Sequence, residues 1–489
     1  MRRHHLLLFL PLFYSCTVSK DYNPNKKYPP KQLQQDYTVL RRILEQKHPS
    51  IYWYTSKDSM DYYFDAGYNA IKDSMTELQF AWKIIAPLTS VIRCGHTSFS
   101  MSKGWDRFIK NKIIPSFPLY LKVWKDTMMV IGNLNRKNRL ISNGSFITSI
   151  NGISSQEMIG YMFHYLAEDG YSENVNYIRL SSDFPYFHRN IFGLYRNYQV
   201  SYTDTAGNFQ NAVVPYFQPV SDTTKNKETL KKWHKIKYTR EEKLEYTRSL
   251  QYDSSYALMT INDFSKGHLK KFFRKSFREM RKNRTRNLVI DIRANGGGDI
   301  IKSVFLTRYL RNTPFKVADT AEATSNTLAP FTRYISHGFF NNLGLLLVTH
   351  REKDGRYHFG YWQRHTFKPK RHNHFKGDVY ILTNGLTFSA SSIFCNDVKG
   401  QDNIKLVGEE TGGGWYGNSG IMIPDITLPH TKIRVRLPFF RLVQYQHVPV
   451  KGTGVMPDVF IGPNWRDILN GVDTKIQKVK EMITQKNGS

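Results

Sequence analysis

A chain of 489 residues is longer than one hydrophobic core normally serves, so about two to four domains are expected. Hydrophobic residues make up 40% of the chain and aromatic residues 14%, which excludes general disorder. The 70 Lys and Arg against 40 Asp and Glu give a net charge of +30. Because this charge is spread along the chain and no nucleic-acid-binding motif accompanies it, we expect a solvated basic surface and no nucleic-acid partner.

The N-terminus has the features of a bacterial export signal. Arg2 and Arg3 precede the apolar run Leu6–Phe13, and Ser15 and Cys16 follow it. This run is too short to cross a bilayer. A cysteine after a small residue is typical of a lipoprotein signal, with Cys16 as the lipidated residue, and a plain signal peptide is the alternative.

These features lead to an expected location. Residues 1–16 would be the lipoprotein signal peptide, and residues 17–31, rich in Lys, Pro and Asn, would form a tether. We expect a lipid-anchored protein of the bacterial cell envelope, in the periplasm or associated with the outer membrane.

The next segment, residues 32–110, is predicted to form an N-terminal helical cap. Helical spacing of apolar residues runs through Leu33, Tyr37 and Leu40 and continues to about Ile92. The pattern turns to β after Arg93–Phe99.

Residues 111–220 carry the signals of a small β domain. Short apolar or alternating runs predict strands at Tyr120–Trp124, Thr127–Ile131 and Phe146–Ile150. Ser154 with Glu157 forms a capping box that opens a helix. The order of glycine, strand, Ile-Asn-Gly and helix resembles a PDZ-like peptide-binding module, and another kind of small β domain is the alternative.

A polar linker over residues 221–250 leads to residues 251–466, where strands and helices alternate. Such alternation predicts an α/β layer with mostly parallel strands. The predicted strands are Tyr256–Ile261, Leu288–Asp291, Val379–Leu382 and Ile404–Val407. The predicted helices are Lys266–Lys282, Ile300–Arg311 and Ser391–Lys399, and residues 467–489 are expected to form a C-terminal helix or tail.

Two segments in this region carry the chemistry. Leu288–Gly298 is a β run that ends in three glycines, whose backbone N–H groups can approach a substrate oxygen closely. Val379–Ser392 is a β run that ends in serines at a strand-to-helix turn. Ser391 or Ser392 is expected to cap the helix, which leaves Ser389 free to present its hydroxyl. An oxyanion hole and a nucleophile together predict acyl-transfer chemistry.

Several motifs in this order resemble the C-terminal processing (tail-specific) serine protease family. They are Asp291–Gly298, Thr387–Ser391, Gly408-Glu409 and the closing Gly-x-x-Pro-Asp motif at Gly454–Asp458. The resemblance implies an α/β fold with a ClpP/crotonase-like catalytic core, the helical cap and the PDZ-like β module. It also implies that the PDZ-like module holds substrate C-termini.

The resemblance also assigns site residues. Ser389 would be the nucleophile, and Gly297 and Ala390 would donate the N–H groups of the oxyanion hole. One branch of the family takes its base from a lysine, which the corresponding stretch Gly412–Gly417 lacks. The other branch resembles the tricorn core protease and uses a histidine at the end of the cap, where His96 stands. His96 is therefore the candidate base.

The residue that orients His96 is not evident in the sequence. The glutamate that the tricorn-like pattern places before the closing motif has no counterpart in Val450–Gly454. Thr97, Ser98 or Glu409 are the candidates for this position. Lys451 would depress the pKa of the imidazolium if it lay close.

No metal or other cofactor is expected. A group of histidines has spacings that match no standard ligand pattern, and basic residues crowd it: His350, His358, His365, His372 and His374. Gly296–Gly298 lacks the Lys-Ser/Thr of a phosphate loop. Cys94 and Cys395, the cysteines after the signal, could form one disulfide or remain two buried thiols.

The sequence therefore predicts an exported serine endopeptidase that acts on polypeptide substrates. A catalytically weakened peptide-binding protein on the same scaffold is the alternative. A crotonase-like acyl-thioester enzyme would share the oxyanion geometry, but no residues support a coenzyme A pocket, and the export signal argues against it.

Overall fold

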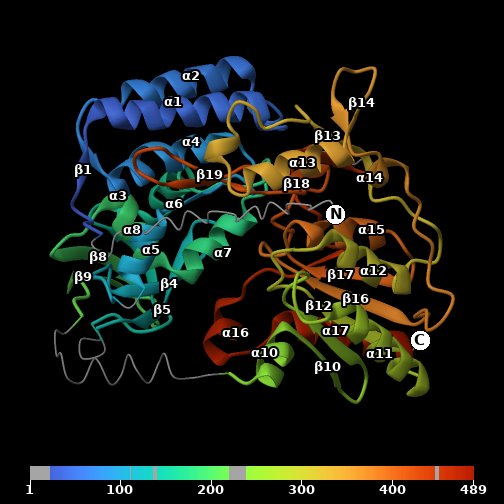
Figure 1. Cartoon of the computed structure of the whole chain (residues 1–489). Helices are drawn as coiled ribbons and strands as arrows, with labels where there is room; N and C mark the ends of the chain where they lie inside the picture. Colours follow the sequence, from blue (N-terminus) through green and yellow to red (C-terminus); the bar gives the residue numbers. More distant parts are fainter. Residues whose placement is uncertain (1–21, 111, 136–139, 220–237, 446–450, 489) are drawn as a thin grey trace, which may run out of the picture.

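In a computed structural model of the chain, residues 22–110, 112–135, 140–219, 238–445 and 451–488 are described. The predicted signal peptide with Cys16 lies outside the described residues, as does most of the predicted linker. Figure 1 shows two lobes, one formed by the N-terminal helices and the first β sheet, the other by the α/β layer. The predicted α/β class is confirmed.

The N-terminal cap is helical, as predicted. Its elements are α1 (Pro30–Lys47), α2 (Lys57–Asn69), α3 (Glu77–Phe80), a π-helical turn η1 (Ala81–Ile85), α4 (Ala86–Val91) and α5 (Lys103–Ile109). The cap begins earlier than expected, because β1 (Lys27–Tyr28) pairs with β2 (Met75–Thr76), and Tyr22 donates a hydrogen bond to Glu77 Oε2 at 2.6 Å. The last ten residues of the predicted tether, 22–31, therefore belong to the folded cap.

The second unit is an antiparallel sheet with three helices packed on it. Its strands, in the order in which they pair, are β4 (Leu119–Trp124), β5 (Thr127–Asn133), β6 (Phe146–Ile150), β8 (Asn197–Thr203) and β9 (Phe209–Pro215). β7 (Ile153–Ser154) pairs with β6, and the helices are α6 (Ser155–Phe163), α7 (Asn174–Ser182) and α8 (Phe184–Phe192). The predicted capping box is present, since Ser154 and Glu157 exchange both hydrogen bonds. The PDZ-like character of this unit stays a prediction.

The predicted α/β layer is a six-stranded sheet that is parallel except for its first strand. Its order is β10 (Arg248–Tyr252), β11 (Ala257–Ile261), β12 (Asn287–Asp291), β16 (Asp378–Thr383), β17 (Ile404–Gly408) and β22 (Val459–Phe460). One face packs against α11 (Leu269–Lys282), α12 (Ile300–Leu310) and α15 (Ala390–Val398). The other packs against the C-terminal helix α17 (Thr474–Gly488). Two short helices, α10 (Arg240–Thr247) and α16 (Trp465–Asn470), precede β10 and α17.

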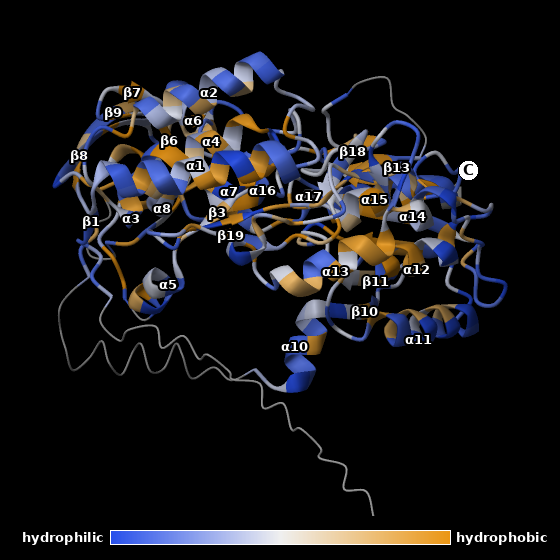
Figure 2. Cartoon of the chain, turned by 45° about the horizontal axis from the view of Figure 1, so that its top comes forward, coloured by the Kyte–Doolittle hydropathy of each residue, from blue (hydrophilic) through white to orange (hydrophobic). Residues whose placement is uncertain are grey.

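Helix α11 illustrates how the basic composition is accommodated. Its apolar side chains, among them Phe273 and Phe277, are buried against the sheet, while its Lys and Arg residues lie on the opposite face (Figure 2). This division is what an amphipathic surface helix requires. None of the helices in the described ranges is long and apolar enough to span a membrane.

A second sheet, absent from the sequence prediction, joins the α/β layer to the cap. Its order is β14 (His350–Arg351), β15 (Tyr357–His358), β13 (Ala318–Ala323), β21 (Phe440–Gln444) and β18 (Gly417–Gly420). Between its strands lie η2 (Thr332–Tyr334), α13 (Gly338–Val348) and α14 (Gly360–Arg364). Apolar residues of this sheet share one hydrophobic core with α1, α2 and α4. The cap is therefore packed directly against residues 238–445 and 451–488, the α/β half of the chain.

A third, small sheet ties the predicted base to the α/β half. It pairs β19 (Asp425–Thr427) with β20 (Arg434–Arg436), and β20 with β3 (Phe99–Ser100). Because β3 begins three residues after His96, its pairing with β20 holds the loop that carries the histidine against the α/β half of the chain.

Candidate active site

Ser389 stands at the turn between β16 and α15. The strand ends at Thr383, and α15 begins at Ala390, so Ser389 is the residue directly before the helix. Its φ of 57° and ψ of −123° lie in a region that side-chain-bearing residues rarely adopt. The hydroxyl of Thr387 donates to the Ile292 carbonyl at 3.2 Å, which ties the turn to the end of β12. The turn leaves Ser389 half-buried at the end of the sheet, a position from which its hydroxyl can reach other groups.

The predicted cap of α15 is wrong. Ser391 and Ser392 lie inside the helix and are fully buried, and the Ser392 hydroxyl donates to the Thr387 carbonyl at 3.1 Å. The helix begins at Ala390, one residue earlier than the predicted start at Ser391. Ser389 occupies the cap position, and its side chain makes no capping bond.

Two glycine loops close around Ser389. A Cβ on Gly297, whose φ is 105°, would lie 2.6 Å from Ser389 Cβ, and one on Gly413 would lie 2.8 Å from the Ser389 nitrogen. Only glycine permits these approaches. The Gly297 N–H donates to Asn295 Oδ1 at 2.9 Å in this state, so the predicted oxyanion role requires that bond to be exchanged. The Ala390 N–H begins α15, where the helix dipole favours negative charge.

His96 comes from the loop between α4 and β3 and meets Ser389. Its Nε2 lies 3.0 Å from Ser389 Oγ, although the two residues are 293 positions apart. The imidazole is 4% exposed, and its ring packs on Phe388 with 4.7 Å between centroids. Burial lowers the pKa of His96 to about 3, and the charges of Arg436 and Arg179 add to the shift. The imidazole is thus neutral near pH 7, the form that can accept a proton.

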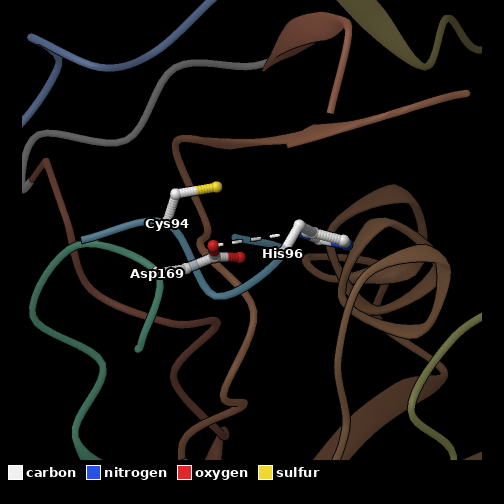
Figure 3. Close-up of side chains that lie close together, drawn as sticks. All are labelled: Cys94, His96 and Asp169. Atoms are coloured by element: carbon white, nitrogen blue, oxygen red, sulfur yellow. Dashed lines mark ion pairs between the residues drawn. The ribbon is translucent and has the colours of Figure 1, made fainter. Parts of the chain in front are cut away.

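Asp169, which the sequence prediction missed, faces the other nitrogen of this imidazole. It lies in the loop between α6 and α7, and its Oδ1 is 3.9 Å from His96 Nδ1 (Figure 3). The carboxylate accepts the Gly95 N–H at 2.7 Å and the Gly414 N–H at 3.3 Å. Burial raises the pKa of Asp169 to about 7, although the two N–H groups oppose the shift.

The carboxylate is positioned by loops from three parts of the chain. Asp169 itself is held by Gly95 of the cap and Gly414 of the α/β half. The residues that follow Asp169 also bind distant loops. The Tyr171 N–H donates to the Gly452 carbonyl at 2.7 Å, and the Ser172 hydroxyl donates to the Thr411 carbonyl at 2.6 Å. Such contacts cannot be read from local sequence, which explains why no motif pointed to Asp169.

Two of the residues expected to orient His96 are engaged elsewhere. Thr97 Oγ1 lies 2.7 Å from His48 Nε2, and Glu409 pairs with Lys475 at 2.6 Å. The third, Ser98, accepts the Arg436 N–H with its backbone carbonyl. The ammonium of Lys451 lies over the rings of Trp53, Tyr54 and Tyr416, and the charges that shift the His96 pKa are those of two arginines instead.

The two cysteines are separate, buried thiols, so the disulfide alternative is excluded. Among the clustered histidines, His358 is buried and its Nε2 pairs with Asp354 at 2.8 Å, while Nδ1 faces Gln363 at 2.8 Å. The nearby Glu322 pairs with two arginines, Arg356 and Arg441. His358 and the carboxylates near it therefore have partners within the protein.

Comparison with known proteins identifies a peptidase family and a shared fold. Residues 255–461 match the model of peptidase family S41. The fold is similar to that of mature CPAF complexed with lactacystin, with a TM-score of 0.63 and 14% identity over 93% of this chain and 98% of that one. This likeness shows a shared fold. No curated protein matches the sequence.

Two further solved structures resemble the chain more distantly. The photosystem II D1 C-terminal processing protease has a TM-score of 0.40 and 13% identity over 88% of this chain and 94% of that one. The tricorn protease has a TM-score of 0.42 and 16% identity over 93% of this chain and 37% of that one.

Proposed function

Since the chain carries a domain of the serine peptidase family S41 over residues 255–461, we propose that it is a serine endopeptidase that uses Ser389 as nucleophile and His96 as base. The observation that carries the proposal is the 3.0 Å contact between Ser389 Oγ and His96 Nε2. A serine hydroxyl needs such a base to become a nucleophile. Asp169, whose Oδ1 lies 3.9 Å from His96 Nδ1, would be the carboxylate that stabilises the imidazolium, a residue that the sequence did not reveal.

The proposed first step is attack of Ser389 Oγ on a peptide carbonyl. With the imidazole proton on Nδ1, Nε2 accepts the serine proton, and an imidazolium forms in a buried site. The Asp169 carboxylate, 3.9 Å from Nδ1, stabilises this cation. The imidazolium then donates its proton to the leaving amine, and a water molecule hydrolyses the acyl-enzyme by the same steps.

The oxyanion that develops during attack needs N–H donors. The Ala390 N–H at the start of α15 is one, and the helix dipole reinforces it. The Gly297 N–H is the second, once it exchanges Asn295 Oδ1 for the substrate oxygen. A peptide carbonyl is an acceptor similar to the Asn295 amide oxygen, whereas the oxyanion formed on attack carries a full negative charge, so this exchange favours the transition state over the bound substrate.

Substrate and location extend the proposal. The substrates are polypeptides, and the antiparallel β4–β9 unit, which lies beside the site through the loop of Asp169, would hold their C-termini. The chain would be exported and anchored through a lipidated Cys16 in the cell envelope. These parts rest on the sequence features of the N-terminus and of the β module.

A fluorophosphonate probe tests the catalytic assignment. The full chain should be labelled at Ser389, and mass spectrometry should locate the adduct there. Ser389→Ala should abolish labelling, and His96→Ala should slow it by about 10²- to 10⁴-fold because the base is lost. Ser391→Ala is the matched control, since this serine lies two residues further on, buried in α15, and should leave labelling unchanged.

Two outcomes would contradict the proposal. Labelling that survives Ser389→Ala would show that another residue is the nucleophile. A wild-type chain that is neither labelled nor able to cleave peptides, but binds peptide C-termini, would support the alternative of a catalytically weakened binding protein.

A further inference from the structure

The side of His96 that faces away from Ser389 lies in a compact group of metal-ligating side chains. Cys94, His96 and Asp169 each offer one ligand atom, and these atoms all lie within 4.8 Å of one another. Figure 3 shows Cys94 and His96 on one loop and the Asp169 carboxylate reaching toward them from a neighbouring loop. All three side chains are buried, with exposed fractions of 3–4%.

One nitrogen in this group lacks a hydrogen-bond partner. His96 Nδ1 is buried and has no hydrogen-bond partner among the described residues. Asp169 Oδ1 is at 3.9 Å, which is beyond hydrogen-bond distance. A buried imidazole nitrogen without a partner, aimed at a thiol and a carboxylate, is an arrangement that a cation would complete.

The chemistry of the three ligands selects the ion. A thiolate, an imidazole and a carboxylate together suit a thiophilic divalent cation such as Zn²⁺ or Cd²⁺. A thiolate and a carboxylate carry two negative charges, so a divalent ion would leave the buried site neutral, as burial of charge requires. Ligand atoms of a tetrahedral zinc site lie about 3.3–3.7 Å apart, and those of this group lie within 4.8 Å of one another, so its atoms need to approach by up to about 1.5 Å.

Asp169 can take part without losing its existing bonds. Each carboxylate oxygen has two lone pairs. Oδ1 uses one for the Gly95 N–H at 2.7 Å, and Oδ2 uses one for the Gly414 N–H at 3.3 Å. The remaining lone pairs are available to a cation, while the two N–H groups hold the carboxylate in place.

We propose that Cys94, His96 Nδ1 and Asp169 form a three-ligand site for a thiophilic divalent cation, and that its occupation switches the peptidase off. The inhibitory part rests on the proposed function, whereas the binding part does not. On binding, the Cys94 S–H bond breaks, its proton passes to solvent, and a sulfur–metal bond forms. No group is oxidised or reduced.

Inhibition follows from the proton on the imidazole. A neutral His96 that binds the ion through Nδ1 must carry its proton on Nε2. That nitrogen then donates to Ser389 Oγ and cannot accept the serine proton. The ion also occupies the position from which Asp169 would stabilise the imidazolium. The site therefore removes the base and its orienting carboxylate together, and leaves Ser389 itself untouched.

Binding is measured first, independently of activity. Cd²⁺ is titrated into the full chain carrying Ser389→Ala, and the ultraviolet charge-transfer band of a cadmium–thiolate bond is followed to saturation. We expect one ion per chain. Adding Cys94→Ser should abolish the band and weaken binding by more than about 100-fold, because loss of a ligand exceeds the effect of losing a residue behind it. Cys395→Ala, which changes the other buried thiol, should leave both unchanged.

A second variant keeps the test decisive if Cys94→Ser fails to fold. Asp169→Asn retains the thiol, so the band should remain while the affinity falls by about tenfold or more. A band that survives Cys94→Ser, or one that disappears in Cys395→Ala, would overturn the proposed ligands. A wild-type chain that shows no band with excess Cd²⁺ would overturn the site altogether.

Inhibition is measured separately on the chain with Ser389 intact. For each variant, the rate of peptide cleavage with Zn²⁺ is divided by its own rate without the ion. Zn²⁺ should inhibit the wild type and Cys395→Ala alike, and Cys94→Ser should need a concentration more than about 30-fold higher, in line with its weakened binding. Equal sensitivity of Cys94→Ser would show that the ion acts at another place. If the chain cleaves no peptide at all, the proposed function fails and the cadmium titration still decides the site.

Discussion

Replacing Asp169 with Asn tests whether this carboxylate supports catalysis. The carboxylate oxygen lies 3.9 Å from His96 Nδ1. At the effective dielectric constant of about 20 that fits protein sites, a carboxylate and an imidazolium at this separation attract each other by about 4 kcal/mol. Each 1.36 kcal/mol changes a rate tenfold. Asp169→Asn should therefore lower kcat by about 10³-fold and change KM little, because the imidazolium forms only after the substrate is bound.

The substitution keeps most of the local structure. The Asn carbonyl oxygen can still accept the Gly95 N–H, and only the longer bond from the Gly414 N–H, at 3.3 Å, is lost. Losing one bond of this kind lowers the free energy of unfolding by about 1–2 kcal/mol. A urea unfolding curve would verify that the variant is folded under assay conditions.

The assay is cleavage of a fluorogenic peptide at about pH 8, above the pKa of about 7 to which burial raises Asp169, so that the wild-type carboxylate is ionised. Glu168→Gln is the matched control, since it neutralises the adjacent acid, which pairs with Arg93 at 3.1 Å and does not face His96. A folded Asp169→Asn chain whose kcat stays within about threefold of the wild type would refute the reasoning, as would an equal loss in Glu168→Gln.

Two further predictions concern the packing around the site and the response to acid. Gly95→Ala should strongly reduce fluorophosphonate labelling. The new Cβ would lie 2.6 Å from Phe388 Cζ and would push apart the loop that carries His96 and the turn that carries Ser389. Labelling at the wild-type rate would show that the loop relaxes without moving the histidine. Burial lowers the pKa of His188 to about 3 from 6.5, so its folded form stays neutral while the unfolded form takes up a proton, and stability is lost as the pH falls from about 6.5 toward 3. This residue alone should lower the free energy of unfolding by about 2 kcal/mol between pH 7 and pH 5. In His188→Phe, whose new ring would lie among Phe117, Phe184 and Phe192, denaturant titrations should show a decrease between the two pH values that is smaller by this amount. A decrease equal to that of the wild type would contradict the idea that His188 stays neutral in the folded chain.

The central strands of the six-stranded sheet could be predicted from the sequence because they are short and strongly apolar. The prediction of Leu288–Asp291 and Val379–Leu382 matches β12 and β16 to within one residue at each end. Both strands are buried on both faces, which produces the continuous apolar runs that sequence patterns detect well. The helices that follow were found for the same reason, since α11 and α12 cover one face of this sheet.

The region between α12 and β16 could not be predicted in this way. Its strands β14 and β15 are two residues long, and β13 is paired with β21, which lies more than a hundred residues further along the chain. Such strands gain their stability from partners distant in sequence and not from a local pattern. The helix start at Ala390 was misplaced for a related reason, because the tight turn at Ser389 and its glycine neighbours override the capping preference of Ser391.

The candidate site shows the same difference between what motifs reveal and what only tertiary contacts create. Ser389 and His96 were identified through motifs, and the structure places them 3.0 Å apart. Asp169 belongs to no motif, because its position is created by contacts: its oxygens accept the N–H groups of Gly95, in the cap, and Gly414, in the α/β half. No glutamate stands before the closing motif, and the carboxylate nearest His96 Nδ1 comes instead from the loop between α6 and α7. Three parts of the chain must therefore pack together before this carboxylate faces the imidazole, and a short sequence motif cannot report such an arrangement.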